Sequence, residues 1–461
     1  MKLNRRQVLT LGAISAAAAG FTGTSREFIG KAKAQTHTIE WRNWSGYLSA
    51  TPTDIYAPAD VDELLASMTT MPPPLRPVGA GHSFSNLVPT PGVIISMDRI
   101  AGLVNYDPLT EKARFRAGTR LFQIAQELEA LGRALPNMPD INKQTFAGAI
   151  STATHGTGTE LTALHGFVTG LTIATPAGEL LACSETENPE AFRAAQVSLG
   201  ALGIVTEIET ETLPLHRLRK TQWFEPFEDV IANAPDRARD HRHWEFYYLP
   251  YTGMALVITN DETEDPVWRD PERNDNQDMA DLRMLESLTW WAPPVRRFLS
   301  RRLMSDAGAS SEVDTNWKVL SSEQRAVRFN EMEYHVPVDA AQRCFREVVE
   351  TVEREGVRVF FPFEFRYIKG DDAWLSPFEG GDRCSIAIHR YFEEDPLPLQ
   401  EIVEPIFLGH DGRPHWGKMN SRTAQDFAAM YPNWQDFLNV RGALDPDGRM
   451  LTPYMREVFG I

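Results

Sequence analysis

Glycine placement constrains the fold of this chain more than any other feature of its sequence. Residues 76–85 carry Gly79 and Gly81 on either side of a single residue, directly after a short apolar run. Such a turn lets successive backbone N–H groups point into one concavity, which can hold an anionic group. The segment lacks the third glycine of the dinucleotide fingerprint and the Gly-Lys-Ser/Thr of a P-loop. Taken alone, it favours a plain tight turn.

A second segment, residues 144–158, is built almost wholly of small side chains. It permits close approach of the backbone to a flat or anionic ligand, or alternatively forms a packing seam between a helix and a strand. Residues 200–206 again combine two glycines with the start of a strand. This recurrence favours a ligand-binding role for the first turn.

The chain is too long for one hydrophobic core, and its 461 residues favour two or three domains. Residues 50–216 alternate between helix and strand patterns, and Pro214 marks a boundary beyond which Trp, Tyr and Phe become common. Beyond it we expect an amphipathic helix over 340–355, a strand over 357–367 and an exposed loop over 260–281. Before it we expect strands at 75–78, 92–97, 113–117 and 203–213, a hairpin over 170–182, and helices at 121–131 and 189–199.

The N-terminus predicts an export signal. Arg5 and Arg6 precede a short, alanine-rich apolar stretch and a small-residue cleavage pattern at 32–34. Paired arginines in this position are typical of twin-arginine export, and the apolar run is shorter than the ~20 residues that a membrane anchor needs. We therefore expect residues 1–34 to be a cleaved twin-arginine signal peptide and the mature protein to be periplasmic or extracellular. Because this route carries folded proteins, a cofactor acquired in the cytoplasm is also expected.

Charge and cysteine content argue against several classes of protein. The formal net charge is −17, and cleavage of the basic leader makes it more negative. So acidic a chain is a poor ligand for nucleic acid or an anionic membrane. The three cysteines, Cys183, Cys344 and Cys384, are widely spaced and odd in number, so we expect core residues rather than a disulfide framework. No histidine pair has a metal-ligand spacing such as HExxH, which argues against a metal hydrolase.

In their order and spacing, the three glycine-rich segments closely resemble the vanillyl-alcohol-oxidase-type (PCMH-type) FAD-binding fold, in its sugar-1,4-lactone oxidase and alditol oxidase branch. Stretches within 363–377, 413–418 and 445–449 also fit this branch, the second reading Arg-Pro-His-Trp-Gly-Lys. The resemblance extends over essentially all of the mature chain. It implies an α+β protein with a two-subdomain FAD-binding domain at 45–216. It also implies a substrate (cap) domain at 217–420, whose antiparallel sheet is flanked by helices, and a C-terminal segment at 421–461 that packs back on the FAD domain.

The resemblance implies the cofactor contacts as well. His82 lies where many members attach the 8α-methyl carbon of the flavin to a histidine nitrogen, so we expect covalently linked FAD; the alternative is a histidine that only lines the pocket. His155 lies in the second segment and is as compatible with a structural role as with a functional one. The other residues expected to contact FAD are Gly79, Ala80, Gly81, Ser83, Phe84, Gly118, Ser151, Thr154, Gly156, Gly158 and Ile204.

Glu364 and Arg366 are the first candidates for a catalytic site. They lie two residues apart in a predicted strand and therefore share one face, while the neighbouring phenylalanines point to a core. The alternative is an ion pair on an exposed sheet, worth at most ~1 kcal/mol. The resemblance places Lys418 at the flavin as a third charged group. His389 could also reach the site, or be an ordinary core or surface histidine.

Together these features imply an FAD-dependent oxidoreductase that acts on a sugar 1,4-lactone of the L-gulono- or D-arabinono- type by hydride transfer to flavin N5. Arg366 and Lys418 would polarise the hydroxyl and the flavin, and Glu364 would orient substrate hydroxyls. Electrons would pass to O2 or to a cytochrome or quinone, which allows a peripheral contact with a respiratory chain. The resemblance places the strand position near the flavin, at which relatives control access of oxygen by residue size, at about Ile95, and so bulky a residue there implies hindered access for O2. The alternatives are an alditol oxidase of the xylitol or sorbitol type and a non-catalytic carbohydrate-binding protein on a degenerate flavin fold.

Overall fold

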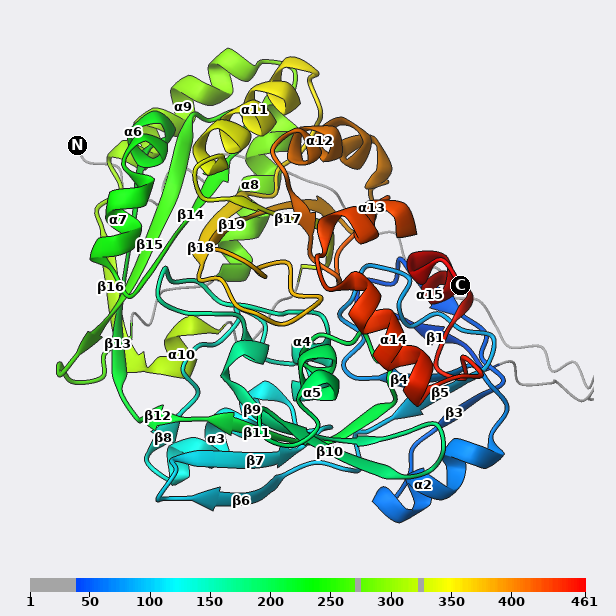
Figure 1. Cartoon of the computed structure of the whole chain (residues 1–461). Helices are drawn as coiled ribbons and strands as arrows, with labels where there is room; N and C mark the ends of the chain where they lie inside the picture. Colours follow the sequence, from blue (N-terminus) through cyan, green and yellow to red (C-terminus); the bar gives the residue numbers. More distant parts are fainter. Residues whose placement is uncertain (1–38, 270–274, 322–326) are drawn as a thin grey trace, which may run out of the picture. The chain divides into compact units, whose positions relative to one another are not determined.

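The first half of the chain forms two small sheets with helices beside them (Figure 1). The computed structural model describes residues 39–269, 275–321 and 327–461, and the predicted signal at 1–34 lies outside them. A parallel three-stranded sheet has the order β3 (Asp54–Tyr56), β5 (Val93–Ser96), β4 (Leu75–Val78). An antiparallel five-stranded sheet has the order β10 (Leu180–Ser184), β9 (Val168–Ala174), β11 (Ile204–Glu211), β7 (Lys112–Arg116), β6 (Leu103–Asp107).

The helices of this half follow the predicted caps and periodicity. Helix α2 (Val61–Thr70) begins where the Asp60 side chain accepts a hydrogen bond from the Glu63 N–H, as expected of an N-cap. Helix α3 (Leu121–Ala130) ends before Gly132, whose φ of +70° suits glycine. The remaining elements are the short helices α4 (Phe146–Ser151), η2 (Leu164–Phe167) and α5 (Pro189–Gln196), and the two-stranded pairs β1 (Trp41–Arg42) with β2 (Ser49–Ala50) and β8 (Arg133–Ala134) with β12 (Leu213–Pro214).

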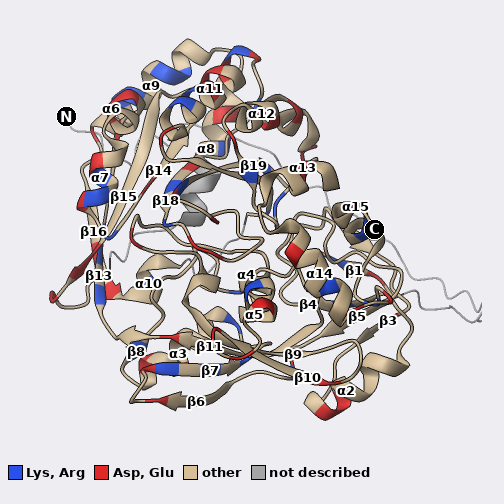
Figure 2. Cartoon of the chain, in the orientation of Figure 1, with Lys and Arg blue, Asp and Glu red and all other residues tan. Residues whose placement is uncertain are grey.

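The second half forms one eight-stranded sheet, whose pairs are all antiparallel. Its order is β16 (Ser310–Thr315), β13 (Arg217–Pro226), β15 (Met254–Thr263), β14 (His243–Leu249), β18 (Phe363–Ile368), β19 (Arg383–Tyr391), β17 (Phe329–Pro337), β20 (Arg413–Pro414). Helices α6 (Phe227–Ala232), α7 (Ala234–Asp240), α11 (Ala341–Arg354) and α12 (Leu397–Gly409) bury their apolar residues against one face of it. Charged positions also occur along β14, β18 and β19 (Figure 2).

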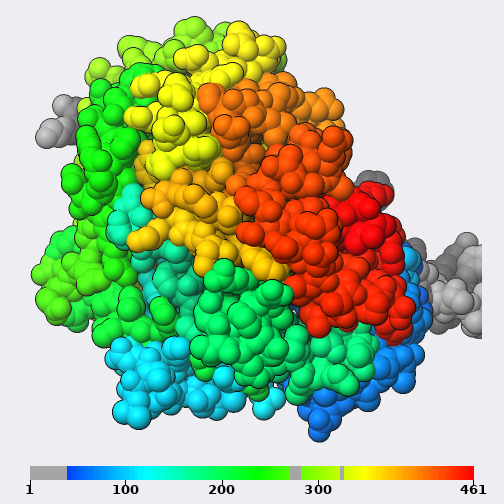
Figure 3. Space-filling view, in the orientation of Figure 1, coloured from blue at the N-terminus to red at the C-terminus, as the bar shows by residue number. Residues whose placement is uncertain are grey.

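Two large hydrophobic cores form within the described residues. One lies between the eight-stranded sheet and its helices, and includes Phe246, Phe345 and Phe365. The other joins the sheets of the first half to the C-terminal helices α13 (Ala424–Met430), α14 (Trp434–Leu444) and α15 (Pro453–Phe459). The backbone oxygen of Arg449 accepts a hydrogen bond from the Leu75 N–H at 2.7 Å, and Figure 3 shows the last residues beside the first described ones. The C-terminal segment thus packs on the first half, whereas the exact domain boundaries stay predictions.

Several sequence expectations need adjustment. The expected loop at 260–281 was wrong at both ends, because β15 continues to Thr263 and helix α8 (Asp275–Thr289) begins at Asp275. The strand expected over 357–367 begins only at Phe363. The three cysteines are free and buried, as expected. Among the described residues, no helix is both long and apolar enough to cross a membrane.

Candidate active site

The candidate site lies on the face of the eight-stranded sheet that is turned away from its helices. In β14, β18 and β19 apolar residues alternate with polar ones, and the apolar set belongs to the helix-covered core. Arg366 pairs in register with Glu245 on one side and with Ser385 on the other, and Glu364 pairs with Tyr247. Because paired residues of neighbouring strands lie side by side on one face, this alternation concentrates polar side chains in one patch.

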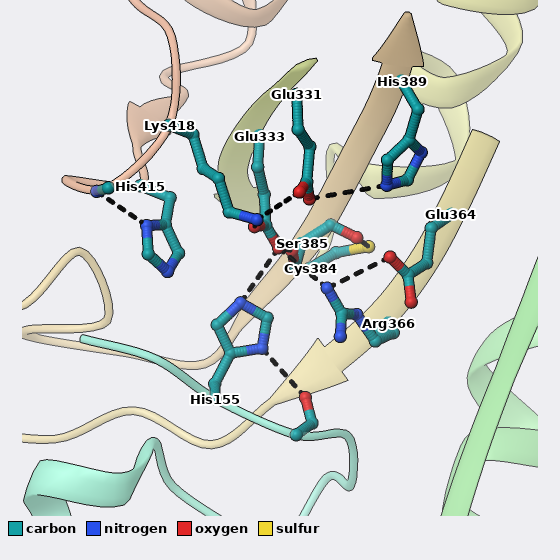
Figure 4. Close-up of polar contacts among 12 residues, drawn as sticks. His155, Glu331, Glu333, Glu364, Arg366, Cys384, Ser385, His389, His415 and Lys418 are labelled. Carbon is teal, nitrogen blue, oxygen red and sulfur yellow. Dashed lines mark hydrogen bonds and ion pairs between the residues drawn. The ribbon is translucent and has the colours of Figure 1, made fainter. Parts of the chain in front are cut away.

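Glu364 and Arg366 form a buried ion pair in this patch (Figure 4), with Glu364 Oε2 3.2 Å from Arg366 Nη2. Their residues are only 5% and 7% exposed, which excludes the pair on an exposed sheet that the sequence left open. The Tyr247 hydroxyl donates a hydrogen bond to Glu364 Oε1 at 2.6 Å. Burial alone would raise the pKa of Glu364, but Arg366, then His389 and Tyr247, outweigh it and hold that pKa below its usual value.

Glu333, from β17, connects the cations of the site. Its Oε1 accepts hydrogen bonds from Arg366 Nη2 at 2.9 Å, from His155 Nε2 at 3.0 Å and from the Ser385 hydroxyl. Its Oε2 lies 3.7 Å from Lys418 Nζ. Burial would raise the pKa of Glu333, yet the neighbouring cations hold it well below its ordinary value, so this carboxylate stays ionised.

Lys418 approaches the same patch from the loop after β20. Its ammonium group pairs with Glu331 of β17 and lies 5.3 Å from the centre of the Phe84 ring. His389 Nδ1 lies 3.1 Å from the Pro362 carbonyl oxygen, to which it must donate, and its Nε2 faces Glu331 Oε1 at 3.6 Å. His389, which the sequence left open, therefore belongs to the site.

Three further histidines lie beneath the patch. Both ring nitrogens of His155 face oxygens, the Gly156 carbonyl at 2.8 Å and the Glu333 carboxylate at 3.0 Å. His415 is different, because burial lowers its pKa to about 3 and its Nδ1 accepts the Gly417 N–H at 3.0 Å. Its proton is therefore on Nε2. His335, wholly buried beside both, has no hydrogen bond on either ring nitrogen within the described chain.

Glu245 differs from the other carboxylates of the patch. It is half-buried, and among the described residues no hydrogen bond or ion pair engages its carboxyl group. Burial, and then the charge of Glu364, raise its pKa to about 7 against the opposing effects of Arg366 and Lys220. The site thus holds one acid that titrates near neutrality next to one that stays ionised, which is a common arrangement in proton-transferring enzymes.

The predicted cofactor loops meet the charged patch directly. The Phe84 N–H donates to the Gly417 carbonyl at 2.7 Å, and the Ser85 hydroxyl donates to the Trp416 carbonyl at 2.6 Å. On the other side, the Gly158 N–H donates to the Tyr367 carbonyl at 2.8 Å, one residue from Arg366. The first loop is therefore fixed to the Lys418 segment and the second to the strand of Glu364 and Arg366.

These loops fit a flavin dinucleotide in several respects. Within the described chain, the half-exposed amides of Ala80, Gly81 and Ser83 donate no hydrogen bond, as expected of a nest for an anionic group. Thr154 Oγ1 is buried and has no hydrogen-bond partner among the described residues. A Cβ on Gly79 would lie 2.1 Å from Thr145 Oγ1, so the two loops touch and only glycine fits. His82 stacks on Trp44 with ring centres 5.1 Å apart.

The other predicted cofactor residues lie within or beside these loops. A Cβ on Gly118 or Gly156 would collide with backbone oxygens of Met97 or Met138. Phe84 belongs to the second core and Ile204 to the first. The Ser151 carbonyl accepts the Leu199 N–H.

Sequence reasoning did not identify Glu331, Glu333, Tyr247 or Ser385. For the first two no clear signal existed in the sequence, because acids at alternate positions of a strand share one face, and that face can be solvent-exposed as readily as buried. Two groups of side chains, His155–Glu333–His415 and Glu331–Glu364–His389, lie close enough to hold a metal ion. In both groups, Arg366 or Lys418 already neutralises the carboxylates, so the charge that an ion would supply is present in the protein.

Comparison with protein families matches residues 208–458 to a model described as D-arabinono-1,4-lactone oxidase and residues 52–184 to an FAD binding domain. Among curated relatives, an L-gulono-1,4-lactone dehydrogenase of Mycobacterium tuberculosis is 32% identical over 91% of this chain and 99% of its own. An L-gulonolactone oxidase of Bos taurus is 28% identical over 91% and 98%, and an alditol oxidase of a Streptomyces species 26% over 90% and 98%.

Among solved structures, the cholesterol oxidase of Brevibacterium sterolicum superimposes with a TM-score of 0.72 at 14% identity, over 91% of this chain and 96% of its own. That identity is too low to carry function, but it establishes the architecture. The α+β organisation, an FAD-binding part of PCMH type followed by an antiparallel sheet flanked by helices, is therefore as the sequence predicted.

Proposed function

The chain belongs to the D-arabinono-1,4-lactone oxidase family of FAD-dependent oxidoreductases, and from that premise we propose that it oxidises a sugar 1,4-lactone at the patch of β17, β18 and β19. The observation that carries this assignment is the convergence of Glu364, Arg366 and Lys418 around two buried carboxylates, beside the glycine loops. A degenerate binding protein would have no need to retain all three charged groups. An alditol is the second substrate class, because one relative is named as an alditol oxidase.

Oxidation of a carbinol needs a fixed substrate, stabilisation of charge on its oxygen and a group that accepts the hydroxyl proton. Glu364 is ionised and held by Tyr247, so it can accept hydrogen bonds from substrate hydroxyls. Arg366 and Lys418 supply positive charge to the oxygen that loses its proton. His389 donates from Nδ1 to the Pro362 carbonyl, and its Nε2, which faces Glu331 Oε1 at 3.6 Å, is a candidate proton acceptor when that nitrogen carries no proton.

We assign FAD to the loops at 79–85 and 144–158, where the amides of Ala80, Gly81 and Ser83 and the Thr154 hydroxyl lack partners in the described chain. FAD, when bound, supplies the two-electron acceptor for the carbinol. His82 would carry a covalent link to it. After acid precipitation, yellow colour should stay with the wild-type protein and pass into the supernatant for His82→Ala. Complete release from the wild type would contradict the link.

Substrate class is tested by anaerobic mixing of the purified yellow enzyme with a panel of sugar 1,4-lactones, alditols and aldoses. We expect bleaching of the flavin absorbance near ~450 nm to be fastest with lactones of the L-gulono- or D-arabinono- type. Bleaching by xylitol or sorbitol with no response to lactones would replace the lactone assignment with the alditol one. No bleaching by any member would contradict both.

The assignment of the patch is tested with Glu364→Gln and Arg366→Lys. Each should lower the rate of flavin bleaching at saturating substrate by a factor of roughly 10² or more, with flavin content unchanged. The matched control is Glu160→Gln, whose carboxylate forms a surface pair with Lys369 and is 83% exposed. Rates of both site variants within a few-fold of the control would remove these residues from the chemistry.

The electron acceptor is a separate proposal, since relatives are named both as oxidases and as a dehydrogenase. Ile95 is a core residue of β5 and is wholly buried. We propose that its bulk slows access of O2, so that a cytochrome or quinone is the physiological acceptor. Timed reoxidation in air should be slow for the wild type and faster for Ile95→Ala. Fast reoxidation of the wild type would identify an oxidase.

We also propose that the protein is exported, on the basis of Arg5, Arg6 and the cleavage pattern at 32–34, which lie outside the described residues. In the native host, the mature periplasmic protein should begin at Gln35. Arg5→Lys combined with Arg6→Lys should leave the flavoprotein in the cytoplasm. Equal export of this variant would exclude the twin-arginine route.

A further inference from the structure

A helical hairpin of the second half exposes apolar side chains that no described part of the chain covers. It consists of α8 and α9 (Pro293–Ser305), joined by residues 290–292, and α9 lies at the top edge of the molecule in Figure 1. Trp291 is 71% exposed, Phe298 66% and Leu288 65%. Because three bulky residues so close together are rarely left in water by a soluble protein, they indicate an interaction surface.

Helix α9 buries polar residues and exposes apolar ones, which is the opposite of an ordinary surface helix. The residues that it buries are Arg296 and Ser300, and Arg296 lies over the Tyr251 ring with 5.6 Å between its Cζ atom and the ring centre. Apolar residues of a surface helix normally face the core. Here Val295, Phe298 and Leu303 face outward instead. The apolar side of α9 therefore remains available to a partner.

The charge of α9 is opposite to that of the whole chain. Its sequence contains four arginines and no acid, in a protein with a net charge of −17, and Figure 2 shows blue positions on this helix. Arg297 pairs with Glu353 at 2.6 Å. Arg301 and Arg302 are exposed and form no ion pair with the described residues. This combination of exposed Trp, Phe and Leu with unpaired Arg defines what we call the hairpin patch, formed by Leu288, Trp290, Trp291, Phe298, Arg301 and Arg302.

We infer that the hairpin patch docks the enzyme on an anionic lipid surface. Interfacial helices have apolar and aromatic residues on one side and Arg or Lys beside them, and tryptophan prefers the boundary between headgroups and acyl chains. The arginines are attracted by negative lipid headgroups. With no described helix able to span a bilayer, the binding is peripheral. Because the chain as a whole is acidic, its other surfaces are repelled by anionic headgroups, which limits non-specific attachment.

A second copy of the chain fits this patch less well. Symmetric dimers use the same surface on both subunits. Such a contact would bring Arg301 and Arg302 of each copy close to those of the other, and like charges oppose association. An anionic membrane satisfies the apolar and the basic residues at once.

The inference is tested by sedimentation of the flavin-loaded enzyme with vesicles of phosphatidylcholine, with and without about one third phosphatidylglycerol. We expect binding to the anionic vesicles that weakens as salt is added. Trp291→Gln with Phe298→Gln, and separately Arg301→Gln with Arg302→Gln, should each weaken it by a factor of roughly ten or more. The matched control is Leu109→Gln, since Leu109 is 93% exposed outside the patch.

The outcomes decide between partners. Binding that is absent, or that persists in both double variants, would overturn the inference. A concentration-dependent dimer in sedimentation velocity that Trp291→Gln with Phe298→Gln abolishes would assign the patch to a second copy instead. All variants should oxidise substrate with a soluble dye at the wild-type rate, because the patch is separate from the active site. Vesicle binding can be measured without any substrate, so the inference does not rest on the proposed function.

Discussion

A carboxylate removed from water is stable only when donors replace its hydration. Glu333 meets this condition with Arg366, His155 and Ser385 around one oxygen and Lys418 near the other. Arg366 and His155 depend on Glu333 in turn, because both side chains are themselves buried. Glu333 is therefore a positioning residue, which sets the places of the side chains that we propose to meet the substrate.

Replacement of Glu333 by Gln tests this dependence. Glutamine keeps the shape of the side chain but removes the negative charge that balances the buried cations. We therefore expect the free energy of unfolding to fall by roughly 3 kcal/mol or more, as measured by denaturant unfolding. The surface control Glu160→Gln should change stability by less than about 1 kcal/mol. Equal effects of the two changes would show that Glu333 is dispensable to the site.

The raised pKa of Glu245 gives the protein a predictable pH dependence. An unfolded glutamate titrates near ~4.3, whereas this one titrates at about 7. Between these two pKa values the folded state binds more protons than the unfolded state. The contribution of Glu245 to the free energy of unfolding is therefore complete below the unfolded pKa and is lost as pH rises through about 7. The free energy of unfolding of Glu245→Gln, measured relative to the wild type, should rise by on the order of 1–2 kcal/mol between pH 5 and pH 8. Melting temperatures across this range that run parallel to the wild type would contradict the assignment.

At the level of elements, short-range patterns of polar and apolar residues predicted the strand faces and the amphipathic helix that they specify. The alternation at Glu364 and Arg366 gave their shared face, and the spacing of apolar residues gave α11. The loop at 260–281 was mispredicted because its polar composition conceals a strand end and a helix start. Glu333 was missed because its role depends on contacts with Arg366 and His155, which are distant in sequence. Only the register of the sheet and the position of the small-residue loop bring these residues near it.

The small-residue segment makes its own prediction. A Cβ on Gly156 would lie 2.4 Å from Asn137 Oδ1 and 2.5 Å from the Met138 carbonyl oxygen. Gly156→Ala should therefore displace this loop, cost roughly 1–3 kcal/mol and lower the ratio of flavin to protein absorbance. Gly442→Ala is the control, because a Cβ there meets nothing within 4 Å in helix α14. Full flavin loading of Gly156→Ala would show that the loop adapts.

At the scale of the whole molecule, the C-terminal segment completes the hydrophobic core of the first half. Met450, Leu451, Met455, Val458 and Phe459 are all at most 3% exposed and belong to the core of the first half. Each buried apolar side chain is worth about 1.5–3 kcal/mol. Together they contribute on the order of 10 kcal/mol, as much as the net stability of a typical domain.

Removal of residues 450–461 should therefore abolish folding of both halves rather than weaken one of them, because the glycine loops and the sheet depend on each other for packing. We expect insoluble protein without flavin, judged by far-ultraviolet circular dichroism and absorbance. Deletion of Gly460 and Ile461 alone, both exposed, should leave the enzyme intact. If the longer truncation still bound flavin and unfolded cooperatively, the two cores would be independent, and the C-terminal segment would be an accessory to the FAD-binding part.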